Sequence, residues 1–132
     1  MKPEPGRPAV ILIVEDNPAN QMLAEAVLQG FGYRVNVASS AAQTLGSIER
    51  DRPDLILMDI QLPGQDGLSL TRQLKADPEM KSIPVVALTA DAMAGNRQLS
   101  LDAGCVGYIT KPFDTRALGS QIAGFLKLPR SS

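Results

Sequence analysis

Five short segments rich in apolar residues recur along the chain, and they predict five β-strands. Four are nearly continuous apolar runs, at residues 9–14, 55–58, 84–88 and 106–109. Runs of this length that are rich in Val and Ile are typical of strands covered on both faces. The fifth segment, residues 33–37, alternates apolar and polar residues. This alternation favours an edge strand with one wetter face.

Stretches with helical spacing separate these segments. In the first, Asn17 is the expected N-cap and Pro18 the first helical turn, and Gly30 and Gly32 end the helix. Its apolar residues at helical intervals are Ala19, Leu23, Ala26 and Val27. The second helix is expected from Ser40 to before Pro53, and the third runs through Leu68, Thr71 and Leu74. The fourth is expected over 95–103 and ends at Gly104. The fifth is expected from near Asp114 to before Pro129, with Leu118, Ile122 and Phe125 inward.

The order of elements is therefore strand then helix, five times over. Strands joined by helices pair in parallel through right-handed crossovers, with helices on both faces of the sheet. We predict an α/β fold, a three-layer (βα)5 doubly wound parallel sheet with strand order 2-1-3-4-5, because that order puts the alternating strand at an edge. One domain is expected over residues 9–127, between a disordered leader at 1–8 and a tail at 128–132.

Composition excludes several classes of function. The 13 basic and 14 acidic residues give a net charge of -1, and with only five aromatic residues this argues against nucleic-acid binding. Without any His, neither Ser-His-Asp catalysis nor an imidazole metal ligand is available. The lone Cys105 is expected to be a buried apolar side chain rather than a zinc ligand or half of a disulfide. The longest apolar run has six residues, so we expect no membrane partner and a cytoplasmic location.

Polar and charged residues follow four of the predicted strands. Because carboxyl ends of parallel strands share one edge of the sheet, these residues are expected to meet there. Each has a plain structural explanation when taken alone, as a turn residue, a strand former or a solvated charge. Coincidence is a poorer explanation for all of them together. They are Glu15 and Asp16, Asp59, Thr89, and Thr110 with Lys111.

Three carboxylates at one edge repel one another and require a counter-charge. Oxygen ligands without His or Cys select a hard cation, Mg²⁺ or Mn²⁺. A divalent ion, a lysine and a hydroxyl together form a pocket for a phosphoryl group, and a carboxylate is itself able to act as the nucleophile. No phosphate-binding loop of the type G-x-x-x-x-G-K-[ST] is present, so nucleotide binding has no support.

At these positions the sequence resembles the receiver domains of two-component response regulators. The resemblance is carried by Glu15-Asp16, residues 57–63 with Asp66-Gly67, residues 87–90 and residues 111–113, and it extends over 9–126. It implies the CheY-like form of the flavodoxin-like fold. Single-domain regulators and the receivers of hybrid histidine kinases share these motifs, so both origins stay open.

The resemblance implies a phosphoacceptor switch with only weak self-catalysed phosphorylation and dephosphorylation, not an enzyme. The donor would be the phosphohistidine of a sensor histidine kinase or a histidine phosphotransfer protein. The implied roles are phosphoryl acceptor for Asp59, Mg²⁺ (or Mn²⁺) ligands for Asp16, Asp59 and the backbone carbonyl of Gln61, a metal-bound water contact for Glu15, phosphoryl binding for Thr89 and Lys111, and an aromatic switch for Tyr108.

Further positions are implied to tune or transmit the signal. Gln61 and Asp91 lie where the family adjusts dephosphorylation, and small Ala90 leaves room for the donor. The output surface is expected on the fourth helix, fifth strand and fifth helix, and donor docking is expected on the first helix. The output residues are Arg97, Gln98, Tyr108 and Arg116, and the docking residues are Pro18, Gln21 and Met22.

Three other functions compete with this one. A phosphatase of the haloacid dehalogenase type requires a second Asp two residues after the nucleophile, where this chain has Gln61. A pseudo-receiver that never accepts phosphate is disfavoured by the intact acidic, hydroxyl and lysine positions. A flavodoxin-like FMN carrier lacks a hydroxyl-rich loop after the first strand and aromatic residues to flank the flavin.

Overall fold

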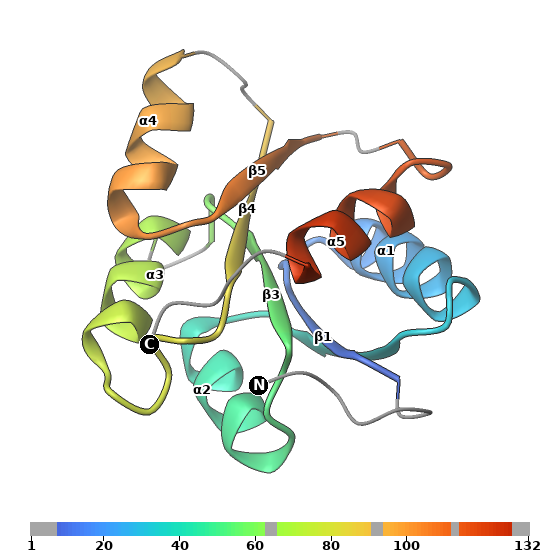
Figure 1. Cartoon of the computed structure of the whole chain (residues 1–132), viewed down its shortest axis with the longest axis horizontal. Coiled ribbons are helices and arrows are strands. Elements are labelled where there is room, and N and C mark those ends of the chain that lie inside the picture. The colour runs from blue at the N-terminus through green and yellow to red at the C-terminus, as the bar shows by residue number, and fades with distance from the viewer. Residues whose placement is uncertain (1–7, 63–65, 91–93, 112–113, 128–132) are drawn as a thin grey trace.

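The computed structural model describes residues 8–62, 66–90, 94–111 and 114–127 and confirms the predicted architecture. Five parallel strands form one sheet in the order β2-β1-β3-β4-β5 (Figure 1). The strands are β1 (Val10–Val14), β2 (Arg34–Ala38), β3 (Leu55–Asp59), β4 (Val85–Thr89) and β5 (Gly107–Thr110). The helices are α1 (Pro18–Gly30), α2 (Ala41–Arg50), α3 (Gly67–Ala76), α4 (Ala94–Ala103) and α5 (Leu118–Leu126).

Helices cover both faces of the sheet. Figure 1 shows α1 and α5 on one side and α2, α3 and α4 on the other. The core is accordingly divided into two apolar clusters. One contains Ile13, Leu28 and Ile122 under α1 and α5, and the other contains Leu70 and Met58 under the opposite helices.

The central strands are buried throughout, as their continuous apolar runs predict. Every residue of β1, β3 and β4 is buried, whereas β2 and β5 lie at the two edges and are partly exposed. Parallel pairing carries the last residues of the strands to one edge, where Val14 pairs with Met58 and Asp59 with Leu88. This register puts the polar residues that follow the strands next to one another.

The start of α1 agrees with the sequence, but of its four expected apolar residues only Val27 packs against the core, where it is half-buried. Asn17 caps the helix, because its side chain accepts hydrogen bonds from the N–H groups of residues 19 and 20. The expected apolar positions Ala19, Leu23 and Ala26 are exposed. The buried residues are instead Ala24 and Leu28, and the half-buried Asn20 and Gln21 continue the same face toward the carboxyl edge.

The start of α5 differs from the prediction as well. The helix begins at Leu118 rather than near Asp114, and a turn lies between them in which Ala117 N–H donates to the Asp114 carbonyl at 3.0 Å. Leu118 and Ile122 are buried as expected, and Phe125 is half-buried.

Within the described ranges, no helix is long and apolar enough to cross a membrane. Residues 1–7 of the leader expected at 1–8, the tail 128–132 and Asp91 lie outside those ranges.

Candidate functional site

The polar residues that follow the strands meet at the carboxyl edge of the sheet. Asp59 and Thr89 are the last residues of β3 and β4, and both side chains are buried. Glu15 follows β1 and is fully buried, whereas Asp16 beside it is exposed. Lys111 follows β5 and is half-buried, with its main-chain N–H donating to the Thr89 carbonyl at 2.6 Å.

The ammonium group of Lys111 joins two of the carboxylates. Its Nζ lies 2.9 Å from Asp59 Oδ2 and 3.1 and 3.2 Å from the two oxygens of Glu15. The other oxygen of Asp59, Oδ1, accepts a hydrogen bond of 2.9 Å from the N–H of Gln61. Residues that are 52 and 96 positions apart in the chain are thus in direct contact.

The first turn of α1 contributes a second set of contacts to this edge. Asn20 Nδ2 donates to Glu15 Oε1 at 2.6 Å. Gln21 Nε2 donates to the main-chain carbonyl of Glu15 and, at 3.0 Å, to Ser39 Oγ after β2. Asn20 was not among the predicted site residues. Its signal in the sequence is its place four and eight residues before the buried Ala24 and Leu28, which puts a polar residue on the inner face of the helix.

The backbone behind Asp59 is packed tightly against α3. Asp66 caps this helix by accepting hydrogen bonds from Leu68 N–H at 2.7 Å and Ser69 N–H at 3.1 Å. A Cβ atom on Gly67 would lie 2.8 Å from Ile60 Cα and closer still to the Asp59 carbonyl oxygen. Only glycine therefore permits this approach, so the Asp66-Gly67 pair fixes the main chain on which Asp59 is carried.

Burial and charge alter the protonation of the site. The pKa of Glu15 is raised to about 7. Desolvation is the largest cause and the neighbouring Asp59 adds to it, while Asn20 and Lys111 oppose it. Desolvation alone would lower the pKa of Lys111. The hydrogen bonds and charges of Asp59 and Glu15 outweigh it, so that this pKa lies above its ordinary value. One ammonium group thus faces an excess of acidic groups.

The donor set suits a hard divalent cation. One carboxylate oxygen from each of Glu15, Asp16 and Asp59 lies within 4.8 Å of the others. All three are oxygen donors, two are buried, and the chain has no His. Mg²⁺ and Mn²⁺ prefer such ligands, and they would supply the positive charge that a single lysine leaves lacking.

The other predicted residues lie around this centre or away from it. Gln61 and Ala90 are exposed at the same edge, and Asp91 lies outside the described residues. Tyr108 is half-buried on β5 and lines a groove with Ser120, Gln121, Gly124 and Phe125 of α5. Of the remaining predicted surface residues, Pro18, Met22, Gln98 and Arg116 are exposed, Gln21 is half-buried, and the side chain of Arg97 is not described.

Comparison with known families gives a match over most of the chain. The sequence profile of the family "Response regulator receiver domain" matches residues 11–123. The curated relatives include the polar-differentiation response regulator DivK of Brucella anthropi, which is 40% identical over 119 residues, covering 90% of this chain and 97% of the relative.

Solved structures share the fold and, in two cases, contain a divalent ion. The receiver domain of sensor histidine kinase PA1611 from Pseudomonas aeruginosa PAO1, with a magnesium ion coordinated in its active-site cleft, is 41% identical and superposes with a TM-score of 0.82. That match covers 92% of this chain and 100% of the other. The Mn²⁺-bound form of response regulator Rcp1 is 27% identical with a TM-score of 0.75, covering 95% and 100% of the two chains.

Proposed function

Because the chain belongs to the family of response regulator receiver domains, the signalling switches of two-component systems, we propose that Asp59 accepts a phosphoryl group from a partner protein. The donor is a phosphohistidine of a sensor histidine kinase or a histidine phosphotransfer protein, since this chain has no His of its own. The proposal concerns the receiver itself, because its relatives include both a single response regulator and the receiver of a sensor kinase.

The arrangement of Lys111 around Asp59 is the observation that supports this function best. A buried carboxylate at a strand end, 2.9 Å from an ammonium group, is held on one side by the Gln61 N–H and on the other by Lys111. An ammonium group in this position is able to follow negative charge from the carboxylate to a phosphoryl oxygen. Thr89, buried at the end of the neighbouring strand, is assigned a second phosphoryl oxygen.

The acidic residues hold the cation that this transfer requires. We assign Asp16, Asp59 and the backbone carbonyl of Gln61 as direct ligands and Glu15 as a ligand through water. When bound, Mg²⁺ or Mn²⁺ neutralises charge on the phosphoryl oxygens and on the carboxylates. The buried Glu15 and Asp59 keep the site closed on the protein side, and the exposed Asp16 lies where solvent and the donor reach it.

The transfer step exchanges one bond of phosphorus for another. A carboxylate oxygen of Asp59 attacks phosphorus, the bond from phosphorus to the donor imidazole nitrogen breaks, and the imidazole leaves with its electron pair and takes a proton from solvent. The product is an acyl phosphate on Asp59. Exposed Ala90 carries only a methyl group beside Thr89, which leaves space for the donor to approach in line.

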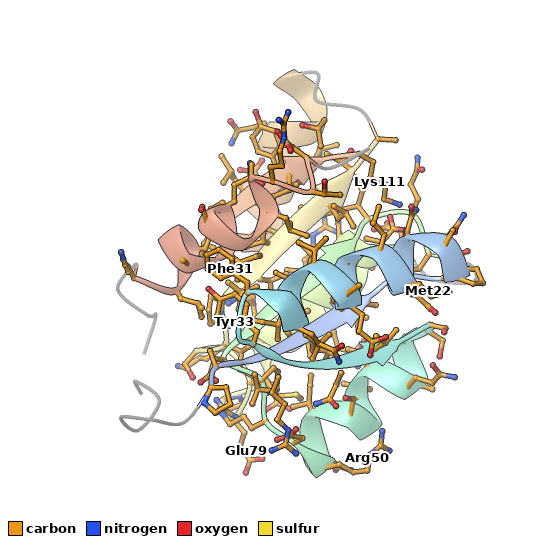
Figure 2. The ribbon with its side chains drawn as sticks, turned by 90° about the vertical axis from the view of Figure 1, so that its right-hand side faces the viewer. Met22, Phe31, Tyr33, Arg50, Glu79 and Lys111 are labelled. Atoms are coloured by element: carbon orange, nitrogen blue, oxygen red, sulfur yellow. The ribbon has the colours of Figure 1, made fainter. Side chains whose placement is uncertain are left out.

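Two surfaces are assigned to partners. The donor docks along the first turns of α1, where Met22 is 70% exposed, and Figure 2 shows Met22 and Lys111 toward the same end of the molecule. The output surface is the face of α4, β5 and α5, where Tyr108 rearranges when Thr89 and Lys111 bind the phosphoryl group. Phosphorylation adds about two negative charges and shifts the population toward the active arrangement.

Incubation with acetyl phosphate and Mg²⁺, followed by intact-mass measurement, tests the function. The expected result is a single phosphoryl adduct that requires Mg²⁺ and is missing in Asp59→Asn. An adduct that persists in Asp59→Asn would move the acceptor elsewhere. Rapid hydrolysis of phosphomonoesters would indicate the phosphatase alternative, and failure of the wild type to bind beryllofluoride or form an adduct would indicate a pseudo-receiver.

A further inference from the structure

The carboxylate of Glu15 is held by a neutral donor as well as by the lysine. Oε1 accepts hydrogen bonds from Asn20 Nδ2 at 2.6 Å and from Lys111 Nζ at 3.1 Å, whereas Oε2 accepts from Lys111 at 3.2 Å. Glu15 is fully buried, so its carboxylate depends on these donors for the hydrogen bonds that water would otherwise provide.

The two donors of Glu15 differ in what else they must do. Lys111 is shared with Asp59, and under the proposed function it follows charge to the phosphoryl group. Asn20 has Glu15 as its described side-chain partner, and its amide stays neutral at every pH of interest. If Lys111 turns away from Glu15, Asn20 continues to hold Oε1. These two are the side-chain donors to Oε1 among the described residues.

Glu15 needs such a donor more than an aspartate would. Its carboxylate is separated from the main chain by one more rotatable bond, so it has more positions available to it. The main chain at this point is already fixed, because Gln21 Nε2 donates to the Glu15 carbonyl and to Ser39 Oγ. The carboxylate itself is held by Lys111 and by Asn20, and of these two donors only Asn20 is not shared with Asp59 among the contacts of the described residues.

We propose that Asn20 is a positioning residue of the metal centre, which holds Glu15 through Oε1 and so fixes the carboxylate that would contact a water of the bound cation. This inference rests on the proposed function, because it assumes a divalent cation between Glu15, Asp16 and Asp59. Partners that orient metal-binding groups typically change metal affinity by about 10- to 100-fold when they are removed.

Calorimetric titration of the whole chain with Mg²⁺ tests this role in Asn20→Ala and in the isosteric Asn20→Asp. We expect Asn20→Ala to weaken Mg²⁺ binding by about tenfold. Asn20→Asp removes the same donor but adds a carboxylate that itself attracts Mg²⁺, so we expect it to weaken binding less than Asn20→Ala does.

Asn36→Ala is the matched control. Asn36 Nδ2 donates to Asp51 Oδ2 at 2.9 Å, so this variant also removes an amide–carboxylate hydrogen bond, at a half-buried position on β2 far from the site. It is expected to leave the Mg²⁺ affinity unchanged even where it lowers the thermal unfolding temperature as much as Asn20→Ala does.

The outcomes separate this proposal from the proposed function. Mg²⁺ binding by the wild type with unchanged affinity in both Asn20 variants would overturn the role of Asn20 alone. Equal weakening in Asn20→Ala and Asn36→Ala would also overturn it, because the effect would then follow stability. A wild type that binds no Mg²⁺ and forms no adduct would overturn the proposed function, and this inference with it.

Discussion

At the amino edge of the sheet, charged side chains bond to the main chain or, as Arg34 and Asp51 do at 3.0 Å, to a single opposite charge, whereas at the carboxyl edge one lysine is shared between two carboxylates. Lys75 Nζ donates to the carbonyls of Lys81 and Ile83, and Arg52 donates to the carbonyl of Glu79. Asp54 accepts a hydrogen bond from the N–H of Val10 at 2.7 Å. Glu79 and Lys111 lie on opposite sides of the view in Figure 2.

The difference shows which charges stabilise the fold and which are available for chemistry. At the amino edge the charges named above are matched by polar groups of the fold or by one opposite charge, and they require no added ion. At the carboxyl edge Lys111 is shared between Glu15 and Asp59, with Asp16 close by. The fold therefore places an excess of negative charge at one edge. A bound cation, and later a phosphoryl group, would change how Lys111 and the carboxylates pair there.

The largest expected effect comes from Gly67→Ala at the carboxyl edge. The added methyl group would overlap the main chain of Asp59 and Ile60. To relieve the overlap, either α3 or the end of β3 that carries Asp59 would have to move. We expect the free energy of unfolding to fall by about 3 kcal/mol or more, as measured by urea denaturation.

Gly124→Ala on α5 is the control for that substitution. A Cβ atom at Gly124 meets nothing within 4 Å, so this variant is expected to raise the free energy of unfolding by about 0.5–1 kcal/mol through helix propensity. A Gly67→Ala variant as stable as the wild type would show that the main chain behind Asp59 is not constrained in this way.

Removing one lysine from each edge compares the two edges directly. Lys111→Met leaves the buried carboxylates of Glu15 and Asp59 without their ammonium partner, and we expect a loss of about 3 kcal/mol at pH 8 without divalent cations. Mg²⁺ is expected to restore much of this loss. Lys75→Met removes hydrogen bonds to two carbonyls and is expected to cost about 1–2 kcal/mol, whether or not Mg²⁺ is present. Equal responses of the two variants to Mg²⁺ would remove the distinction between the edges.

A smaller effect is expected from pH in the absence of divalent cations. The pKa of Glu15 is raised from 4.5 to about 7, so the folded state favours its protonated form. The stability this provides is fully present below about pH 4.5 and is lost as the pH rises through about 7. Urea denaturation in a chelator is therefore expected to give a lower free energy of unfolding at pH 8 than at pH 5, by roughly 1–2 kcal/mol. Glu15→Gln is expected to reduce that difference, and a difference of the same size in this variant would assign it to another group.

The sheet could be predicted from the sequence because β1, β3 and β4 are apolar on both faces. Such continuous apolar runs, separated by helices, are typical of a parallel sheet covered on both sides. The apolar spacing of α1 misled about Leu23 for a physical reason. Near the carboxyl edge the inner face of that helix carries the half-buried Asn20 and Gln21, which bond to Glu15, and Leu23 is 45% exposed. The spacing of apolar residues identifies the buried face of a helix only where that face packs against apolar residues.

The site was predicted as a set of residues but not as a set of contacts. Strand ends were enough to bring Glu15, Asp59 and Lys111 to one edge. Lys111 bonds to both carboxylates, and Gly67 packs on the main chain beside Asp59. Both contacts depend on atomic positions that are accurate to a few tenths of an ångström, which spacing along the chain does not provide. These follow from the packing of α3 and the path after β5, which are properties of the folded chain and not of local spacing.

The thermal unfolding temperature with Mg²⁺ or with a chelator tests the claim that the carboxyl edge requires a cation. At a Mg²⁺ concentration ten times the Kd, binding is expected to add about 1.4 kcal/mol, or roughly 5 °C, to wild type and to Lys75→Met. In Asp59→Asn, which lacks one carboxylate of the three, the increase is expected to be much smaller. No Mg²⁺-dependent increase in the wild type, or the same increase in Asp59→Asn, would contradict the account.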